Sequence, residues 1–321
     1  MADILETVLL LALPASGKSE VRTYLARLSP DECRRDFHMG ATVQLDDYPY
    51  VHLMRRIDDE LAALGQPRLF FKSPAHPFQN GWDWGTLIHL VNEDYDDLVA
   101  RRVRTPATAA GLLFERLDAA AAKVGLPARL AGLDAGVRGR LAAALEADAA
   151  LQLREKHENY PDTLAGKTLV LEFARGGAQG SAMPLEPPFG YRYSVGQLSP
   201  AILEHASILY VWVTPEESRR KNEERARPGA DGSILHHGVP IAVMLGDYGC
   251  DDMDWLEAHS DQPGTAAIAA HGRTYHLPVG RFDNRVDKTS FIREDAKTWK
   301  PADVAAVHAG LKAGFDRLVA K

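Results

Sequence analysis

The chain has 321 residues, of which 45% are hydrophobic and 25% are charged, and its net charge is −7 at pH 7. These values are typical of a globular protein with one large or two modest domains. The negative net charge argues against a protein that coats nucleic acid, although a local basic cluster could still bind phosphate groups.

Cysteine content and hydropathy narrow the class of protein further. Cys33 and Cys250 lie far apart without CxxC spacing, so they predict neither a disulfide framework nor a structural zinc site. The first apolar run, residues 7–13, follows no basic region and is too short for the apolar core of a signal peptide. No apolar stretch reaches the roughly 18 residues of a membrane span. We therefore expect a cytoplasmic protein that does not enter a membrane.

Short apolar runs rich in β-branched residues predict five β-strands. They are residues 7–13, 41–45, 168–173, 208–213 and 274–279. Their nearly continuous apolar character is typical of strands that are buried on both faces of a parallel sheet. Helical patterns separate the runs, so we predict an α/β fold with a doubly wound, five-stranded, mainly parallel sheet.

The long interval between the second and third predicted strands is almost wholly helical in pattern. We interpret residues 48–166 as a helical insertion, and we predict that it forms the region that binds a substrate, the acceptor molecule. It is mounted on a core made of residues 1–47 and 167–321. A separately folding domain is the less favoured alternative, because the chain returns to the same sheet. A final helix is expected from Pro301 onward.

The first predicted strand runs directly into a phosphate-binding pattern, and residues 12–19 read ALPASGKS. This matches the Walker A motif with Ala12 in place of the first glycine. A buried strand that delivers such a loop to a helix N-terminus aims backbone N–H groups at a phosphate. Lys18 would reach the β- and γ-phosphates, and the Ser19 hydroxyl would ligate Mg²⁺. The residues that we predict to bind nucleotide here are Ala15, Ser16, Gly17, Lys18, Ser19 and Glu20. A chance Gly-Lys-Ser sequence in a turn is the alternative.

With this motif between a strand and a helix, the chain resembles the P-loop NTPase superfamily. More narrowly, it resembles the P-loop kinases that phosphorylate nucleosides, nucleotides and other small acceptors. The resemblance covers the five-strand core and does not extend to the helical insertion. It implies ATP or GTP as the phosphate donor, Mg²⁺ as the metal and a small molecule as the acceptor.

Acidic residues follow the second and third predicted strands. In the resembling kinases an acid after the second strand takes the proton of the acceptor or contacts Mg²⁺. We assign Asp46 to the metal and Asp47 to the base, although the order of the two stays open and a simple helix N-cap is the alternative. Glu172 lies where a Walker B-like acid would hold Mg²⁺ through water. A structural ion pair between Glu172 and Arg175 is the other interpretation.

A basic helix after the fourth strand leads into a glycine-containing loop. Residues 225–240 resemble the lid of small-molecule kinases, whose arginines neutralise charge on the transferring phosphoryl group. We single out Arg225 and Arg227 as catalytic residues. Glutamates alternate with the arginines, so an exposed helix with i,i+4 ion pairs is the alternative. The adjacent His236 and His237 suit a substrate contact or surface exposure better than a metal site.

Further polar and aromatic residues are weaker candidates. In the resembling kinases the loop after the fifth strand packs on the adenine, so Asp283, Asn284 and Arg285 are candidate contacts to the base, and a simple turn is the alternative. In the insertion, a set of aromatic and amide side chains suits an acceptor pocket or a corner of the core. That set is Phe78, Asn80, Trp82 and Trp84.

Charged residues near residue 100 also allow two interpretations. Arg101, Arg102 and Arg104 could bind a phosphate of the acceptor, or could favour the C-terminal end of a helix. The acidic residues before them predict a solvated helix face. These are Glu93, Asp94, Asp96 and Asp97.

Together the motifs predict an ATP-dependent phosphotransferase that moves the γ-phosphate to a small-molecule acceptor such as a nucleoside, nucleotide or sugar. The alternative is a nucleotide-driven ATPase or switch whose helical insertion binds a protein partner. A kinase that acts on nucleic-acid ends is less favoured by the net charge. The sequence predicts neither the acceptor, nor the choice of ATP or GTP, nor the oligomeric state.

Overall fold

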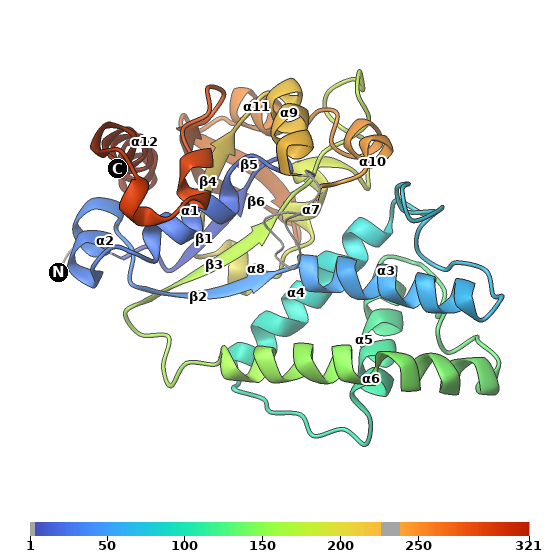
Figure 1. The fold of residues 1–321 in the computed structure, drawn as a ribbon. Coiled ribbons are helices and arrows are strands. Elements are labelled where there is room, and N and C mark those ends of the chain that lie inside the picture. The colour runs from blue at the N-terminus through green and yellow to red at the C-terminus, as the bar shows by residue number, and fades with distance from the viewer. Residues whose placement is uncertain (1–3, 226–237, 321) are drawn as a thin grey trace.

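The computed structural model of the protein describes residues 4–225 and 238–320. Its centre is a six-stranded sheet with the strand order β2-β3-β1-β4-β6-β5 (Figure 1). The strands are β1 (Thr7–Leu11), β2 (Ala41–Asp46), β3 (Lys167–Phe173), β4 (Ala206–Trp212), β5 (Thr265–Ala270) and β6 (Arg273–Asp283). Every neighbouring pair is parallel except β5 and β6. The predicted α/β class and mainly parallel sheet are therefore confirmed.

The predicted number of five strands is wrong, because the antiparallel edge strand β5 was missed. Its sequence, TAAIAA, is mostly alanine, which is depleted in strands, and only Ile268 carries a large apolar side chain. The His271-Gly272 dipeptide, which forms the turn between β5 and β6, is the sequence signal that could have revealed this strand. His271 and Gly272 both have positive φ, at 51° and 76°, as the central residues of a tight two-residue hairpin turn require.

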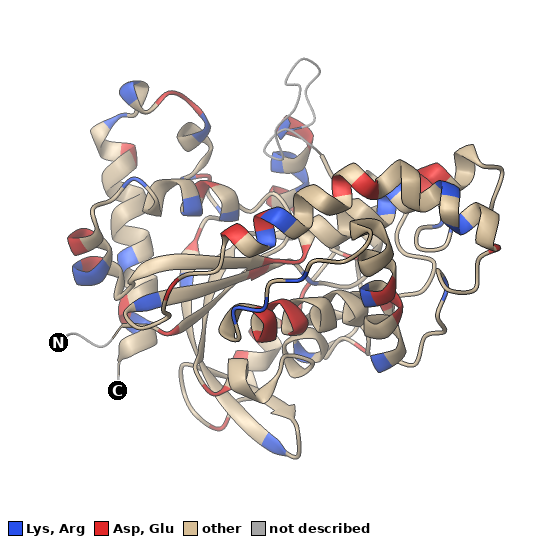
Figure 2. Ribbon diagram, turned by 90° about the horizontal axis from the view of Figure 1, so that it is seen from below, with Lys and Arg blue, Asp and Glu red and all other residues tan. Residues whose placement is uncertain are grey.

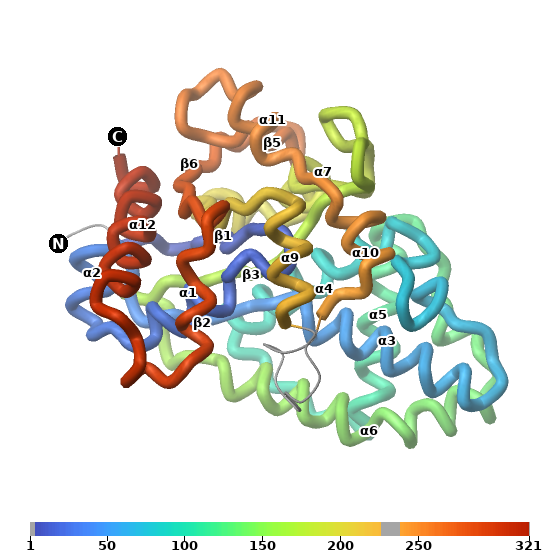
Figure 3. Tube along the Cα trace, turned by 45° about the horizontal axis from the view of Figure 1, so that its top comes forward, coloured from blue at the N-terminus to red at the C-terminus, as the bar shows by residue number. Residues whose placement is uncertain are grey.

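One face of the sheet is covered by the N-terminal and C-terminal helices. These are α1 (Lys18–Leu25), α2 (Pro30–Phe37) and α12 (Pro301–Val319). Helix α12 contacts β6, β4 and α2, and Figure 3 shows it beside α2 although the two are far apart in sequence. Val8 and Leu10 of β1 face this layer, whereas Leu9 and Leu11 face the opposite one. Successive side chains of a strand alternate between faces, so one apolar strand serves both cores.

The opposite face is covered by four helices. They are α4 (Asp83–Val99), α7 (Gly190–Gly196), α8 (Pro200–Leu203) and α11 (Met253–Ala258). Shorter helical segments of the described residues outside the insertion are α9 (Pro215–Arg225), α10 (Ile241–Gly246), η2 (Ser290–Arg293) and η3 (Ala296–Thr298). None of the helices in the described ranges is both long enough and apolar enough to cross a membrane.

Residues 48–166 are helical, and Figure 1 shows most of their helices grouped beside the sheet. Besides α4, they form α3 (Tyr48–Ala63), α5 (Ala109–Lys123) and α6 (Ala135–Glu158). Their apolar faces pack into a core that also contains Leu13 and Val213, which follow β1 and β4. Helix α4 belongs to both cores, since Ile88 and Leu98 pack against the sheet while Leu87 faces the insertion. The insertion is thereby attached to the carboxyl-end side of the sheet.

Candidate functional site

The site lies where the carboxyl ends of β1, β2 and β3 meet. From β1 the chain first forms β2 and β3 on one side and later β4 on the other, so the end of β1 lies at a topological switch point. Ligands of open α/β sheets bind in the crevice at such a point. Asp46 and Glu172 are register partners at the ends of β2 and β3. The sheet therefore brings the predicted acids next to the loop that follows β1.

A cavity of about 510 Å³ opens at this edge of the sheet. It brings together the predicted residues Ala15, Ser16, Lys18, Ser19, Asp46, Asp47, Glu172 and Arg225. Gly17, Glu20 and Asn284 do not line it. Arg227, the histidine pair 236–237 and most of the predicted lid lie outside the described residues.

The β1–α1 loop has a backbone that only small residues accept. Gly17 has a φ of 107° and forms the N-cap of α1. A Cβ atom at this position would lie 2.6 Å from Thr289 Oγ1 and 2.9 Å from Asn284 Nδ2. Ala15 also has a positive φ, of 55°. The glycine thus allows a close approach between the loop and the segment that follows β6.

Asn284 lies beneath this loop and is fully buried. Its Nδ2 donates hydrogen bonds to the Ser16 carbonyl oxygen at 2.7 Å and to Thr289 Oγ1 at 2.9 Å. Its Oδ1 accepts one from the Lys288 amide at 2.7 Å. Because the whole amide group is engaged with the protein, this geometry favours a role in bracing the loop over the adenine contact that we predicted.

Lys18 begins α1 and is folded over the loop. Its Nζ donates a hydrogen bond to the Ala12 carbonyl oxygen at 3.2 Å, and the residue is 8% exposed. Burial lowers the pKa of Lys18, while the nearby carboxylates of Glu172 and Asp46 oppose that shift. A phosphate group in the cavity would replace the carbonyl as a partner of higher charge.

Two of the acids share an arginine that the sequence analysis did not single out. Arg22 Nη1 lies 2.8 Å from Glu172 Oε2 and 3.7 Å from Asp46 Oδ2. Burial, together with the charges of Glu172 and Asp47, raises the pKa of Asp46 to about 7. Arg22 follows Lys18 by four residues and so shares its helix face, which is the signal that could have identified it.

The other arginine, Arg175, pairs with Asp47. Its Nη1 lies 2.6 Å from Asp47 Oδ2, and both side chains are buried. The guanidinium carbon lies 4.7 Å from the centre of the Trp84 ring and 5.2 Å from that of Phe173. Burial raises the pKa of Asp47, against the opposing effect of Arg175. The alternative Glu172–Arg175 pair is wrong, because the two side chains meet different partners.

Glu20 is committed to a separate ion cluster. Its carboxylate is 1% exposed, 3.0 Å from Arg225 Nη2 and 2.6 Å from Arg293 Nε. Burial alone would raise the pKa of Glu20, but the two arginines outweigh it and lower the value. The Glu20 side chain is therefore turned toward α9 and η2, and Arg225 reaches the cavity from the end of α9.

Helix α9 is fixed against the β1–α1 loop. Ser218 Oγ donates a hydrogen bond of 2.7 Å to the Pro14 carbonyl oxygen. Asn222 makes two hydrogen bonds of 2.7 Å with the backbone of Val239. These contacts hold the two described ends of the 225–240 segment close to the β1–α1 loop.

The acids fit a magnesium site that is completed by phosphate oxygens. Among the residues that the structure describes, no three His, Cys, Asp or Glu side chains are grouped so as to hold a metal ion by themselves. Mg²⁺ usually keeps several waters and binds through one or two carboxylates plus substrate phosphates. Ser19, Asp46 and Glu172 offer that donor set. The mutual repulsion that contributes to the raised pKa of Asp46 is what a divalent cation would relieve.

The aromatic segment of the insertion is divided between the pocket and the core. Trp84 is buried and lines the cavity. The rings of Phe78 and Trp84 meet edge to face in the core, with their centres 4.9 Å apart. Trp82 is 39% exposed, and its amide donates to Asn80 Oδ1. Of the four predicted residues, only Trp84 lines this cavity.

The predicted solvated acidic face is wrong for Asp94 and Asp97. Both are buried, at 6% and 0% exposure, because α5, α7 and β2 pack against α4. Lys156 of α6 lies 2.7 Å from both carboxylates, and Arg116 of α5 lies 2.6 Å from Asp94. The negative charges are compensated by cations from the neighbouring helices.

The three arginines near residue 100 are likewise engaged within the insertion. Arg102 and Arg104 pair with Asp97 at 2.5 and 3.2 Å, and Arg101 pairs with Asp162 at 3.1 Å. Figure 2 shows acidic and basic residues interspersed over the molecule instead of separated onto opposite faces. Because all three arginines pair with carboxylates of the insertion, they give no support to the basic groove that a nucleic-acid kinase would need.

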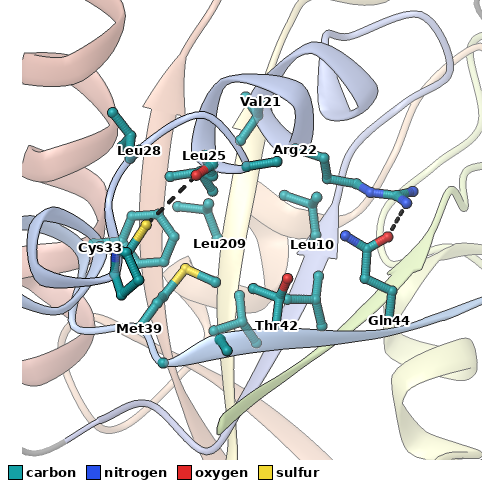
Figure 4. Close-up of a pocket in the computed structure, with 17 residues that line it drawn as sticks. Leu10, Val21, Arg22, Leu25, Leu28, Cys33, Met39, Thr42, Gln44 and Leu209 are labelled. Atoms are coloured by element: carbon teal, nitrogen blue, oxygen red, sulfur yellow. Dashed lines mark hydrogen bonds between the residues drawn. The ribbon is translucent and has the colours of Figure 1, made fainter. Parts of the chain in front are cut away.

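A second cavity, of about 180 Å³ and largely apolar, lies between α1, α2 and β2 (Figure 4). Arg22 lines both cavities and is hydrogen-bonded to Gln44 at the edge of this one. Cys33 lies at the far end, with its Sγ 3.6 Å from the Leu25 carbonyl oxygen. The apolar cavity therefore lies beside α1, the helix that begins at Lys18, but it lacks the cluster of charged side chains that lines the large cavity.

The remaining residues of the large cavity come from parts of the chain that the motifs did not indicate. They include Arg55, Asp247 and Tyr248.

Comparisons of the chain with protein-family models, with curated proteins and with solved structures found no match.

Proposed function

We propose that the protein is an ATP-dependent phosphotransferase that moves the γ-phosphoryl group of ATP to a hydroxyl group of a small molecule. One observation carries this proposal. A Walker A-type loop, three carboxylates at the ends of β2 and β3, and an arginine from α9 all line the same cavity at the switch point of the sheet. Phosphoryl transfer needs positioning and compensation of charge more than covalent chemistry, and this set of groups supplies both.

On the nucleotide side, the loop amides and Lys18 bind the phosphates, and Arg225 compensates charge on the transferring group. Ser19, Asp46 and Glu172 would hold Mg²⁺, which when bound neutralises the β- and γ-phosphate oxygens. Arg22 keeps the two carboxylates oriented by its contacts of 2.8 and 3.7 Å.

On the acceptor side, Asp47 orients the hydroxyl group and takes its proton as the new oxygen–phosphorus bond forms and the bond to the β-phosphate oxygen breaks. Arg175, whose guanidinium lies against the Trp84 ring, fixes Asp47 through their contact of 2.6 Å. The wall beyond Asp47 comes from α3 and α4 of the insertion and from α10, which supports an acceptor-binding region to which the helical insertion contributes.

The test is ADP release from Mg-ATP by the purified protein, alone and with nucleosides, nucleotides, sugars and aminoglycosides. We expect release to rise sharply with one class of acceptor. Lys18→Ala should reduce this rate by about 10²-fold or more, because it removes a charge that stabilises the transition state. Lys123→Ala, at an exposed position of α5, is the matched control and should leave the rate unchanged.

A rate that does not respond to any acceptor would overturn the proposal. ATP hydrolysis that requires Lys18 but no acceptor would instead identify a nucleotide-driven switch. The helical insertion would then be the surface to examine for a protein partner.

A further inference from the structure

We propose that the outer edge of β5 binds an extended segment of another protein as an additional strand, and that this segment carries an acidic side chain beside Arg192. The inference rests on an uncapped strand edge that lies next to a groove with one cation. β5 is at the opposite end of the strand order from β2, away from the large cavity. The inference is therefore independent of the proposed function.

The register of the β5–β6 hairpin shows which backbone groups of β5 point away from β6. Thr265 is opposite Pro278, which has no N–H group, so the two do not form a hydrogen-bonded pair. The amide of the residue after Pro278 donates to the carbonyl oxygen of the residue before Thr265 at 2.9 Å. The two kinds of pair alternate along an antiparallel ladder. The N–H and C=O groups of Ala267 and Ala269 therefore point outward from the sheet.

These outward groups are not capped by the described part of the chain. β5 pairs only with β6 there, and no described loop or side chain forms a hydrogen bond with the backbone of Ala267 or Ala269. At the opposite edge of the sheet, by contrast, Asn159 Nδ2 donates a hydrogen bond of 2.6 Å to the Gln44 carbonyl oxygen of β2. β5 also lacks the lysine, proline or bulge that protects many edge strands. Its edge is open to pairing with another extended chain.

A groove of about 420 Å³ lies beside this edge. Ala267 and Ala269 form one side of it, and residues of α7 and α11 form the other. Both helices contact β5, and Figure 3 shows them next to it. They cover only one face of the sheet, so they would contact every second side chain of an added strand. The groove thus offers backbone pairing on one side and side-chain recognition on the other.

The charge of the groove favours an acidic side chain. Arg192 lines it together with Trp255, and no aspartate or glutamate of the described residues does so. The Arg192 guanidinium carbon lies 5.7 Å from the Trp255 ring centre and has no ion pair within the described ranges. The buried Asp252 carboxylate is occupied by the backbone amides of Tyr191 and Arg192, at 2.6 and 3.1 Å. A carboxylate on the added strand would give the guanidinium a charge-assisted hydrogen bond.

A second copy of this chain suits the edge less well. Antiparallel pairing of two β5 edges needs a twofold axis perpendicular to the joint sheet, and such an axis places α7 and α11 of both copies on the same face. These helices already flank the groove in each copy, so they would compete for the space above the joint. The pairing would also bring a second Arg192 to a groove without a lining acid. An isolated extended segment has neither disadvantage.

The experiment measures the binding of fluorescein-labelled peptides to the full chain by fluorescence anisotropy. The probe is Thr-Val-Thr-Glu-Thr-Val-Thr with both ends blocked. Its glutamate has a valine two residues away on each side, so the same face is presented in either strand direction. A second probe has lysine in place of the glutamate. Two further versions of the first probe carry N-methyl groups on alternate amides, one version for each edge of the peptide.

Four variants are compared with the wild type. Ala267→Pro removes an outward N–H group, at a place in an edge strand where proline is tolerated. Arg192→Met removes the cation of the groove, and Arg192→Glu reverses its charge. Arg273→Met is the matched control, because Arg273 lies on the same hairpin, pairs with Glu204 and does not line the groove. An unchanged circular-dichroism spectrum is the check that each variant is folded.

We expect the glutamate probe to bind the wild type with a Kd below about 1 mM. Binding should weaken about fivefold or more in Ala267→Pro and in Arg192→Met, because each loses a hydrogen-bond donor to the peptide. Arg192→Glu should prefer the lysine probe, and Arg273→Met should match the wild type. One N-methylated version should bind like its parent and the other should not bind, since only one edge of the peptide faces β5.

Three results would overturn the inference. The first is that the glutamate probe does not bind at about 1 mM. The second is that the glutamate and lysine probes bind the wild type equally. The third is that binding is the same in Ala267→Pro and the wild type. Sedimentation over a range of protein concentrations adds a fourth, because a dimer that Ala267→Pro dissociates would assign the edge to a second copy of the chain.

Discussion

Individual side chains at the site are held by partners from distant parts of the chain. Asp47 from the end of β2 pairs with Arg175 from the end of β3, and both are buried. Glu172 from the same strand end pairs instead with Arg22 of α1. Arg175 thus compensates Asp47, and Arg22 compensates Glu172 together with Asp46, which lets three carboxylates coexist at one edge of the sheet.

The Asp47–Arg175 pair gives a prediction at this scale. Arg175→Met should lower the free energy of unfolding by about 3–5 kcal/mol, because it leaves a buried carboxylate without its counter-ion. Asp47→Asn combined with Arg175→Met should recover part of that loss, since both charges are then removed. Chemical denaturation of the two single variants and the double variant measures the coupling. Arg154→Met, at an exposed position of α6, is the control. Losses that simply add would contradict a direct interaction between the two residues.

At the scale of elements, the Glu20 cluster joins three segments that are far apart in sequence. Glu20 lies on α1, Arg225 at the end of α9 and Arg293 in η2. The carboxylate is almost completely buried, so its two ion pairs are shielded from solvent. This contact fixes α9 beside the β1–α1 loop.

Glu20 also makes stability depend on pH. Its folded-state pKa lies below its ordinary value of 4.5, so its contribution is complete above pH 4.5 and is lost as the pH falls through the lowered value. Glu20→Gln should therefore lower the free energy of unfolding by about 3 kcal/mol at pH 7 and by progressively less below pH 4.5. Unfolding curves at a series of pH values measure this difference. Glu216→Gln, whose side chain on α9 is 73% exposed, should show little effect. A difference that is constant with pH would contradict this account.

At the scale of the whole molecule, α4 makes the helical insertion and the sheet parts of one structure. Its side chains enter both apolar cores, and residues after β1 and β4 enter the core of the insertion. A chain organised in this way should unfold in one cooperative transition instead of two.

Two leucines test this cooperativity. Leu98 of α4 packs against the sheet, and Leu141 of α6 is buried in the insertion. Leu98→Ala and Leu141→Ala should each lower the free energy of unfolding by about 2–5 kcal/mol, through lost burial and the cavity that remains. Both should shift one common transition when helix content and tryptophan fluorescence are followed together. An early, separate transition in Leu141→Ala alone would show that the insertion unfolds independently.

Local patterns in the sequence were enough to determine the α/β class of the fold and to predict several residues that line the large cavity. Apolar runs predicted the five parallel strands. Burial on both faces is confirmed for β1 and β4, whereas the expectation is wrong for β2, an edge strand exposed at Ala41 and Thr42, and for β6, which alternates. The Walker A-type motif predicted the loop after β1, and the acids after β2 and β3 followed from their place at strand ends. The edge strand β5 escaped this reasoning because an alanine-rich edge strand lacks both an apolar run and strong β-propensity.

The pairing of charges was decided only by the tertiary structure. Asp94 and Asp97 are charged residues on a helix, and by sequence alone such residues are expected in water. Their burial depends on cations that two other helices deliver. Asp247 carries no local signal at all, since it enters the cavity through a turn that packs on Gly176. The hydrophobic pattern of a helix or strand depends on residues that are close in sequence, so it can be recognised from the sequence alone. The partner of a buried charge depends on how separate elements pack, and only the folded structure determines that packing.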